Sequence, residues 1–454
     1  MNRRFLAYLP VILVFASIAA AEFQVNTHTT NDQKNATIAM EPDGSFVMVW
    51  SSYLQDGSSN GIFGQQFDPN YSPVGGEFQV NTTSSGNQAE PAAAMDAAAG
   101  FVLVWHGPGL TAEDKEDVFA QRFDPNGLPL GDELLVNSYT GGKQLYPSVA
   151  LNNDGTFAVV WESANFPEDG DKAIFGQLYD SNGVRLGDEF VINAEASVCR
   201  YPEVAADANG NFAVVWLEDK SRNSIMAGLF DPNGAPRTDT FKVNTVSFSS
   251  VTRPSIAMDS AGYFAVAWDG DPNLAGLDDI HARLFDPNGA PLSEQFFVNS
   301  TFEGPQRYPK VAMNDRQEFV IVWETRTDPN VNERDIFGQR FNNFGTPLGD
   351  EFLVNTYTEG DQRNAVAALG ENGHFITAWQ SYAQDGSRNG IFAETGRLVG
   401  SADYNGDGYV DFLDYSILAN QWREEGPALP ADLIYDNRID EQDLAEFARQ
   451  WLKR

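Results

Sequence analysis

The sequence predicts an all-β, seven-bladed propeller followed by a small all-α C-terminal domain. The first observation is an apolar run that ends in tryptophan and recurs every 52 to 56 residues, at Trp50, Trp105, Trp161, Trp216, Trp268, Trp323 and Trp379. The second is a Val-Asn-Thr motif or close variant that keeps step with it, at Asn26, Asn81, Asn137, Asn193, Asn244, Asn299 and Asn355. Repeats of this period are typical of propellers. Both markers stop before residue 401, so we expect the propeller over residues 22–400 and a second domain over residues 401–454.

Each repeat is expected to form four short antiparallel strands, a to d. In the third repeat, strand a covers residues 147–151, and the turn at Asp154-Gly155 leads to strand b at residues 157–161. Strand b is apolar throughout, which suits burial on both faces. Strand c follows at residues 174–179, and a strand d such as residues 133–137 ends in the Val-Asn motif. Four strands in about 50 residues is the usual propeller blade.

The register of the repeats predicts how the ring closes. Residues 22–26 read as a strand d with no strands a to c before them, whereas the seventh repeat has strands a to c and no strand d after Leu398. The N-terminal strand can therefore complete the last blade and remove the exposed edges of an open array. A linear solenoid would have no reason to begin and end within a repeat, and the propeller is favoured over other all-β arrays.

The first 21 residues predict an export signal. A basic start at Arg3-Arg4 precedes an apolar run over residues 5–18, and Ala19 and Ala21 suggest cleavage before Glu22. The alternative, a membrane anchor, requires a longer apolar run than this one. We expect a secreted or cell-surface protein, or a periplasmic one, whose mature chain is not inserted in a membrane.

Charge and composition exclude several function classes. The chain of 454 residues has 29 basic and 64 acidic residues, a net charge of −35 that disfavours binding to nucleic acid. Cys199 is the single cysteine, so an internal disulfide framework is excluded. The four histidines lie far apart without ligand spacing, which argues against a zinc enzyme.

A ligand site is expected where the loops approach the central axis. The b–c loops are long and differ between repeats, as functional loops do, and their acidic residues are read as solvated charge rather than as a catalytic pair. Just before strand a, the repeats carry a partial ring of cationic and aromatic residues that also includes Lys34, Glu90 and Tyr146. Such a ring could stack on a sugar or pair with a carboxylate, or it could serve only for salt bridges between blades. The ligand-binding residues predicted from it are Arg200, Tyr201, Arg253, Arg307, Tyr308 and Arg363.

The C-terminal segment contains an acidic loop with the spacing of a calcium site. Oxygen-bearing groups stand at positions 1, 3, 5, 7, 9 and 12 of this loop, and Gly408 at position 6 permits a sharp turn. The predicted Ca²⁺ ligands are Asp403, Asn405, Asp407, Tyr409 through its carbonyl, Asp411 and Asp414. A second loop repeats the pattern with Asp432, Asp436, Arg438 at the carbonyl position, Asp440 and Asp443. An amphipathic helix is expected after each loop, and the two should pack through their tryptophans.

These two loop–helix halves resemble the type I dockerin family over residues 402–452. The resemblance implies calcium-dependent folding and docking to a cohesin domain. This chain departs from the dockerin pattern at Ile434 and Asn437 in the second loop. It also has Phe412-Leu413 and Glu441-Gln442 where dockerins carry small hydroxyl residues, so the two halves are not equivalent. The alternative is a calcium-stabilised cap with no partner.

Three functions follow from these observations. The leading interpretation is an exported calcium-binding protein whose propeller binds a glycan or a protein and whose dockerin-like module docks it to a partner. The first alternative is a polysaccharide-degrading enzyme, a glycoside hydrolase or lyase, on a propeller scaffold. It requires an acidic or His–Tyr–Arg constellation that breaks the sevenfold pattern, and no catalytic residue can be assigned from the sequence. The second alternative is a structural surface component.

Overall fold

The computed structural model describes residues 22–451 except for short segments. These segments are residues 99, 110–114, 165, 167–171, 194–197, 220–222, 247, 249–250, 272–277, 327–332, 372, 398–411, 426–428, 430 and 435–437. The predicted export signal, residues 1–21, lies outside the described residues and stays a prediction. Within the described part, no helix is long and apolar enough to span a membrane.

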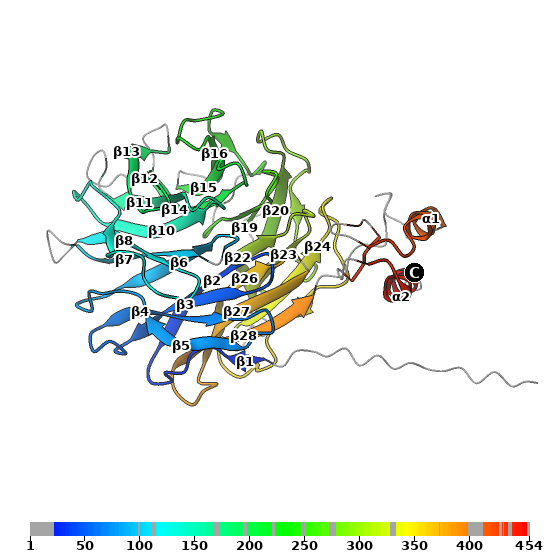
Figure 1. Ribbon diagram of the computed structural model, residues 1–454, viewed down its shortest axis with the longest axis horizontal. Helices are drawn as coiled ribbons and strands as arrows, with labels where there is room; N and C mark the ends of the chain where they lie inside the picture. The colour runs from blue at the N-terminus through cyan, green and yellow to red at the C-terminus, as the bar shows by residue number, and fades with distance from the viewer. Residues whose placement is uncertain are drawn as a thin grey trace, which may run out of the picture.

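The described strands form seven blades of four antiparallel strands, which confirms the propeller (Figure 1). Five blades are separate sheets, and blades 3 and 4 are joined into one eight-stranded sheet by a parallel pairing of Lys172 with Val198. Blade 1 contains β2 (Gln33–Met40), β3 (Phe46–Tyr53), β4 (Asn60–Phe67) and β5 (Pro73–Gln79). Blade 2 contains β6 (Ala89–Met95), β7 (Phe101–Pro108), β8 (Glu116–Phe123) and β9 (Leu134–Leu135). Blade 3 contains β10 (Gln144–Leu151), β11 (Phe157–Ala164), β12 (Lys172–Tyr179) and β13 (Arg185–Val191).

The remaining blades follow the same order. Blade 4 contains β14 (Val198–Ala206), β15 (Phe212–Asp219), β16 (Ser224–Phe230) and β17 (Phe241–Lys242). Blade 5 contains β18 (Ser255–Met258), β19 (Phe264–Gly270), β20 (Asp279–Phe285) and β21 (Phe296–Phe297). Blade 6 contains β22 (Gln306–Met313), β23 (Phe319–Thr325), β24 (Asp335–Phe341) and β25 (Phe352–Leu353). Blade 7 contains β26 (Gln362–Leu369), β27 (His374–Tyr382), β28 (Asn389–Arg397) and, as its outer strand, β1 (Phe23–Gln24).

The ring is closed by the N-terminal strand, as the register predicts. The innermost strands contact one another in sequence around the ring, and β26 contacts β2. In the closing blade, Phe23 of β1 lies opposite Ala393 of β28. The backbone N–H of Val25 donates to the carbonyl of Ile391 at 2.8 Å, and the carboxylate of Glu22 accepts from the N–H of Thr356 in blade 6 at 2.7 Å.

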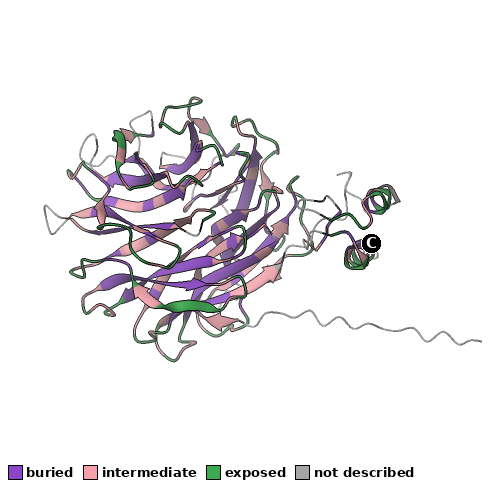
Figure 2. Cartoon of the chain, viewed as in Figure 1, coloured by how far each residue is buried: buried purple, intermediate pink, exposed green. Residues whose placement is uncertain are grey.

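The two sequence markers have distinct structural roles. All seven strand-b tryptophans are at most 2% exposed and lie in the cores, which Figure 2 shows as buried inner strands under an exposed rim of loops. The asparagine of each Val-Asn motif lies at the end of the outer strand and extends its ladder. Asn81, for example, accepts the backbone N–H of Ile62 through Oδ1 at 2.7 Å, and Asn26 does the same for Ile391. Each blade is therefore held by a buried aromatic core and a side-chain bond to strand c.

The C-terminal segment contains the two helices of the described residues, α1 (Phe412–Asn420) and α2 (Glu441–Trp451). A small apolar cluster joins them through Leu418, Leu433 and Phe447. An isolated β-bridge pairs Glu425 with Arg438 in the connection between the helices. Two short helices do not support the predicted all-α domain as such. The chain is nearly all-β, and the helical module is a minor addition to the propeller.

Blade 7 has a half-buried carboxyl group at a ladder position where blades 1, 2, 3 and 6 carry a glutamine. Glu394 of β28 lies opposite Thr377, at the ladder position that Gln177 occupies in blade 3. Gln177 donates through Nε2 to the carbonyls of Leu178 and Gly187. Burial first, and then the Glu22 carboxylate, raise the pKa of Glu394 from 4.5 to about 7. Folding therefore favours the protonated form of this residue.

Glu394→Gln should stabilise the protein at alkaline pH and have little effect in acid. Because the pKa of Glu394 is raised on folding, its protonated form adds stability below pH 4.5, and this contribution is lost as the pH rises through 7. We expect a gain of about 1 kcal/mol in the free energy of unfolding at pH 8, after allowing for partial exposure. Thermal unfolding at pH 5 and pH 8 measures it. An equal gain at both pH values would contradict the titration of Glu394.

Candidate functional site: the central cavity

A β-bulge at the start of the inner strand turns one side chain of each of six blades into the central channel. In β10 the register shifts between Leu145 and Ser148, and the bulged Tyr146 has φ of 51°. The equivalent residues all lie in the left-handed region with φ between 51° and 56°, namely Asn35, Glu90, Tyr146, Tyr201, Tyr308 and Asn364. In blade 5, β18 starts later, and Arg253 takes the place of the bulged residue ahead of it.

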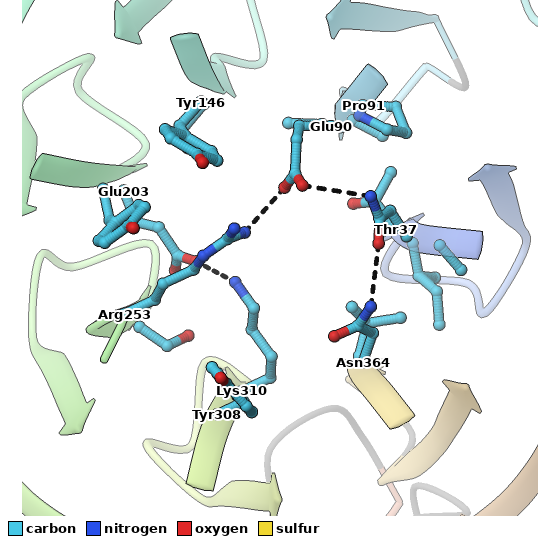
Figure 3. Close-up of a pocket in the computed structure, with 18 of the residues that line it drawn as sticks. Thr37, Glu90, Pro91, Tyr146, Glu203, Arg253, Tyr308, Lys310 and Asn364 are labelled. Carbon is cyan, nitrogen blue, oxygen red and sulfur yellow. Dashed lines mark hydrogen bonds and ion pairs between the residues drawn. The ribbon is translucent and has the colours of Figure 1, made fainter. Parts of the chain in front are cut away.

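This backbone geometry marks the channel entrance as a site of strain. A left-handed conformation costs a non-glycine residue roughly 1–2 kcal/mol, and here six such residues stand side by side around one axis. Bulges of this kind redirect side chains next to functional sites. Together with Arg253, the six residues line a central cavity of about 430 Å³ (Figure 3).

Arg253 is held at the cavity wall by two aromatic rings and one carboxylate. Its guanidinium carbon lies 4.7 Å from the ring centre of Tyr146 and 4.9 Å from that of Tyr201. Its Nη1 donates to Oε2 of Glu90 at 2.7 Å, across the channel from blade 5 to blade 2. Burial lowers the pKa of Arg253, but the Glu90 carboxylate outweighs this effect and the net shift is upward. The cation is therefore fixed in place while its side chain remains 39% exposed.

Two asparagines continue the hydrogen-bond chain on the opposite wall. The Nδ2 group of Asn35 donates to Oε1 of Glu90 at 3.2 Å. The Nδ2 group of Asn364 donates to Oδ1 of Asn35 at 2.9 Å and to Oε1 of Gln380 at 3.1 Å. One side of the cavity thus presents aromatic faces and a cation, and the other presents amides (Figure 3).

A second ion pair crosses the cavity two residues further along the inner strands. Lys310 of β22 pairs with Oε1 of Glu203 of β14. The other carboxylate oxygen of Glu203 accepts the backbone N–H of Ile256 at 3.3 Å. The side chains of Lys310 and Glu203 are 34% and 22% exposed, so both reach the cavity solvent.

His106 lies directly behind Tyr146. The two rings meet edge to face with centroids 6.1 Å apart, and His106 is only 6% exposed. Its Nδ1 is buried without a hydrogen-bond partner. Burial lowers the pKa of His106, against the raising effect of the Glu116 and Glu90 carboxylates, and it raises that of Tyr146 to about 12. At neutral pH the imidazole is therefore neutral and the phenol is protonated.

The structure divides the predicted ligand residues into two groups. Tyr201, Arg253 and Tyr308 line the cavity. The arginines that precede a bulged residue do not line it, because successive residues of a strand point to opposite sides. They pair instead with acids at or next to strand ends: Arg200 with Asp219 at 3.4 Å, Arg307 with Asp278 at 2.6 Å and Arg363 with Asp361 at 2.5 Å.

Sequence reasoning missed four residues that line the cavity, and it also missed His106, which lies behind Tyr146. Asn35 and Asn364 occupy the same repeat position as the predicted tyrosines, and Glu203 and Lys310 follow that position by two residues. Aligning the seven repeats on this position would have found them. His106 had no such signal, because the residue that follows each strand-b tryptophan differs in every neighbouring repeat.

The predicted calcium ligands are only partly described. Asp403, Asn405, Asp407, Tyr409, Asp411 and Asp436 lie outside the described residues, and Asp414 is buried. In the second loop, Asp432 and Asp443 are buried, whereas Arg438 is exposed. Burial raises the pKa of Asp443; hydrogen bonds from three backbone N–H groups oppose this shift, and the Asp432 carboxylate adds to it. Two buried carboxylates at loop positions 1 and 12 fit a bound cation. Among the described residues alone, however, no group of three or more acidic, histidine or cysteine side chains is placed to hold a metal.

Comparison with known proteins identifies the fold. No protein-family model and no curated protein match the sequence. Among solved structures, the polysaccharide lyase Uly1 aligns over 85% of this chain and 94% of its own, with 10% identity and a TM-score of 0.50. A polysaccharide lyase of the ulvan-lyase family PL25 covers 84% and 94% at 10% identity with a TM-score of 0.48. The propeller of the trilobed protease from Pyrococcus furiosus covers 80% and 97% at 9% identity with a TM-score of 0.47. At these identities the likeness concerns the propeller fold and not the activity.

Proposed function

We propose that this protein is a carbohydrate-active propeller that cleaves an acidic polysaccharide in its central cavity by β-elimination. This is the lyase form of the alternative that the sequence left open, and it replaces the non-catalytic binding protein as the leading interpretation. The observation that carries it is the cluster of His106, Tyr146 and Arg253. This cluster breaks the sevenfold pattern, as the enzyme alternative requires, and the sequence alone did not reveal it.

The chemistry of β-elimination matches these three side chains. A base removes the proton on the carbon next to a sugar carboxylate, the adjacent C–O glycosidic bond breaks, and an acid protonates the departing oxygen. A cation at the carboxylate stabilises the charge that develops during proton removal, which is the role of Arg253. Tyr146, which lines the cavity, would first give its phenolic proton to the neutral imidazole of His106, which packs against its ring. The phenolate would then remove the carbon-bound proton and deliver it to the departing oxygen, and His106 would return the first proton to Tyr146.

Glycoside hydrolysis is less well supported by the same cavity. A glycosidase needs two carboxyl groups, one of them protonated to act as the acid. Glu90 and Glu203, the two acidic residues that line the cavity, are each held in an ion pair with a cation, so the described lining residues offer no further carboxyl group for this role. Uly1, whose fold this chain shares, is itself a polysaccharide lyase, and that similarity of fold agrees with an elimination reaction.

Tyr146→Phe should reduce cleavage of a polyuronide by 100-fold or more, as is usual for loss of a general acid–base group. The mature chain would be incubated with pectate, alginate and glucuronan. Ultraviolet absorbance of the unsaturated uronide and release of reducing ends would be recorded together. Tyr308→Phe is the matched control, because Tyr308 lines the same cavity but is not one of the rings that contact Arg253 or His106. It should retain most of the activity.

The two signals separate the possible functions. Reducing ends without ultraviolet absorbance would replace elimination by hydrolysis. Retention of polymer without either signal would favour a binding protein, the second candidate, which agrees with the fact that both cavity cations already have a carboxylate partner. If the protein neither retains nor cleaves any polyuronide, the proposal is contradicted.

We further propose that the C-terminal module binds Ca²⁺ through its acidic loops and is a dockerin-like unit that attaches the exported propeller to a cohesin-like partner. The sequence spacing of the first loop and the buried Asp432–Asp443 pair in the second support calcium binding. Calcium would add positive charge to that of Arg316, which lies 4.0 Å from the Asp432 carboxylate, and would stabilise the loop–helix halves.

Asp403→Ala combined with Asp407→Ala should abolish tight calcium binding at the first loop. Two of its carboxylates would be lost, and hard cations depend on carboxylate number for affinity. Isothermal titration with CaCl₂ and protection of the module from proteolysis measure the effect. Asp286→Ala, in a turn of the propeller that also contains Asn288, is the control. A double variant that still becomes protease-resistant on adding calcium would refute the assignment of this loop.

A further inference from the structure

The two ion pairs of the central cavity join side chains that are far apart in the sequence and come from blades that are not neighbours. Arg253 and Glu90 are 163 residues apart, and Lys310 and Glu203 are 107 residues apart. Both pairs cross the channel between non-adjacent blades (Figure 3). Pairs that tie neighbouring blades together lie elsewhere, as between Arg307 and Asp278. The crossing pairs therefore do not serve to hold adjacent blades together.

Both pairs can be opened at low cost. All four side chains are between 22% and 39% exposed, and ion pairs accessible to water contribute about 1 kcal/mol or less. Arg253 would keep its position without Glu90, because the rings of Tyr146 and Tyr201 hold its guanidinium. A carboxylate arriving from solution could thus take the place of Glu90 on a cation that is already oriented.

Each internal carboxylate also has a second hydrogen-bond donor in place. Glu90 accepts from Nδ2 of Asn35 through the oxygen that does not face Arg253. Glu203 accepts from the backbone N–H of Ile256 through the oxygen that does not face Lys310. A carboxylate that leaves its cation therefore keeps a partner, and the usual penalty for an unpaired charge is reduced.

We propose that Glu90 and Glu203 occupy the binding positions of two substrate carboxylates and that the cavity is selective for a stretch of polymer that carries at least two of them. This rests on the proposed binding of an acidic polysaccharide in the cavity and specifies its class as a polyuronide with successive charged residues. Arg253 stands at the repeat position of Tyr308, two residues before Lys310, so the two cations extend from backbone positions roughly 7 Å apart in depth. That separation is of the order of one sugar residue. Neutral glycans cannot displace the internal carboxylates and are excluded.

The test compares short ligands on the full mature chain in the Tyr146→Phe background, so that binding is measured without turnover. The probes are galacturonic acid, digalacturonic acid and the neutral disaccharide lactose, titrated calorimetrically at 50 mM and 300 mM NaCl. We expect digalacturonic acid to bind at least about tenfold more tightly than the monomer, with loss of affinity at high salt, and lactose not to bind.

Glu90→Gln and Glu203→Gln should each tighten digalacturonic acid binding by about three- to tenfold, because each removes an internal competitor for a cation. Glu294→Gln removes the same charge from an exposed position outside the cavity and should leave the affinity unchanged. Melting temperatures of all variants verify that they are folded. Equal effects of the three substitutions, weaker binding in Glu90→Gln and Glu203→Gln, or comparable binding of lactose would overturn the proposal.

The outcome is separable from that of the proposed reaction. Tighter binding of digalacturonic acid in the two cavity variants, with no cleavage of any polymer by the unmodified chain, would support the exchange of carboxylates and refute the lyase. Cleavage of a polyuronide by a cavity that also binds lactose would support the enzyme and refute the selectivity.

Discussion

A chain that begins at His28 should melt at a markedly lower temperature than one that begins at Glu22. The deletion removes β1, and with it the buried Val25 and the ladder bond to Ile391. It also removes Asn26 and Glu22, which hold Ile391 and Thr356. Lost burial and lost hydrogen bonds together amount to about 5 kcal/mol, or about 5 °C or more in the melting temperature.

A pair of single substitutions distinguishes ring closure from the loss of a free terminus. Asn26 and Asn299 make the same bond, to the backbone N–H of Ile391 at 2.7 Å and of Ile280 at 2.8 Å. Asn299 belongs to a blade that is continuous in sequence, whereas Asn26 closes the ring. Asn26→Ala and Asn299→Ala should destabilise the protein by similar amounts, about 1–3 kcal/mol each. If the deletion leaves the melting temperature unchanged and only Asn299→Ala destabilises, the ring is not closed by β1.

Trp161→Ala should be the most destabilising single substitution among those considered for the propeller, with a loss of about 4 kcal/mol in the free energy of unfolding. Trp161 is 1% exposed, and it lies in the core that blade 3 shares with blade 2. Its indole Nε1 donates to Oε1 of Gln144 at 3.0 Å. Truncation leaves a large cavity and an unpaired buried amide oxygen. Chemical denaturation with urea measures the loss.

Phenylalanine substitutions separate the hydrogen bond from the packing. In blade 5, the residue at the position of Gln144 is Val251, and Nε1 of Trp268 has no hydrogen-bond partner. Trp161→Phe removes both ring volume and a bond, whereas Trp268→Phe removes ring volume alone. We expect Trp161→Phe to cost about 1 kcal/mol more than Trp268→Phe. Equal losses would show that the indole–amide bond adds nothing to stability.

The position of Cys199 follows from the same comparison. Cys199 stands where blades 3, 6 and 7 carry the glutamine that bonds the tryptophan, and it is fully buried. The sequence showed that Cys199 was the single cysteine but not whether it was accessible. Its place in the repeat, once the strands are paired, makes it a core residue of blade 4.

The fold could be predicted because its evidence is repeated. Seven tryptophans and seven asparagines at nearly constant spacing report a period, and a strand d without its blade at the start of the chain reports the closure. Both are local patterns that depend on burial and on strand register, and each repeat tests the others. The C-terminal module repeats its loop–helix unit only twice, and the second copy departs from the pattern at Ile434 and Asn437. The structure describes two short helices there rather than the expected all-α domain.

The site could be predicted only in part, because its chemistry depends on which of two neighbouring residues faces the channel. Arg200 and Tyr201 are adjacent in sequence and looked equivalent. The bulge between Arg200 and Glu203 turns the Tyr201 side chain into the channel, and Arg200 pairs with Asp219 instead. A bulge has a weak signal in a single sequence, since a left-handed tyrosine or glutamate looks like any other residue.

The sequence by itself determined the seven-bladed ring, its closure by the N-terminal strand and the axial position of Tyr201, Arg253 and Tyr308. Only the tertiary structure decided which charges meet across the channel. Glu90 and Arg253 are far apart in sequence and belong to blades that do not touch, so no periodicity links them. The same holds for His106, which lies behind Tyr146 because two neighbouring blades bring them together. Strand repeats follow from local burial, whereas a site at the axis is made by single residues from blades that meet only when the ring is complete.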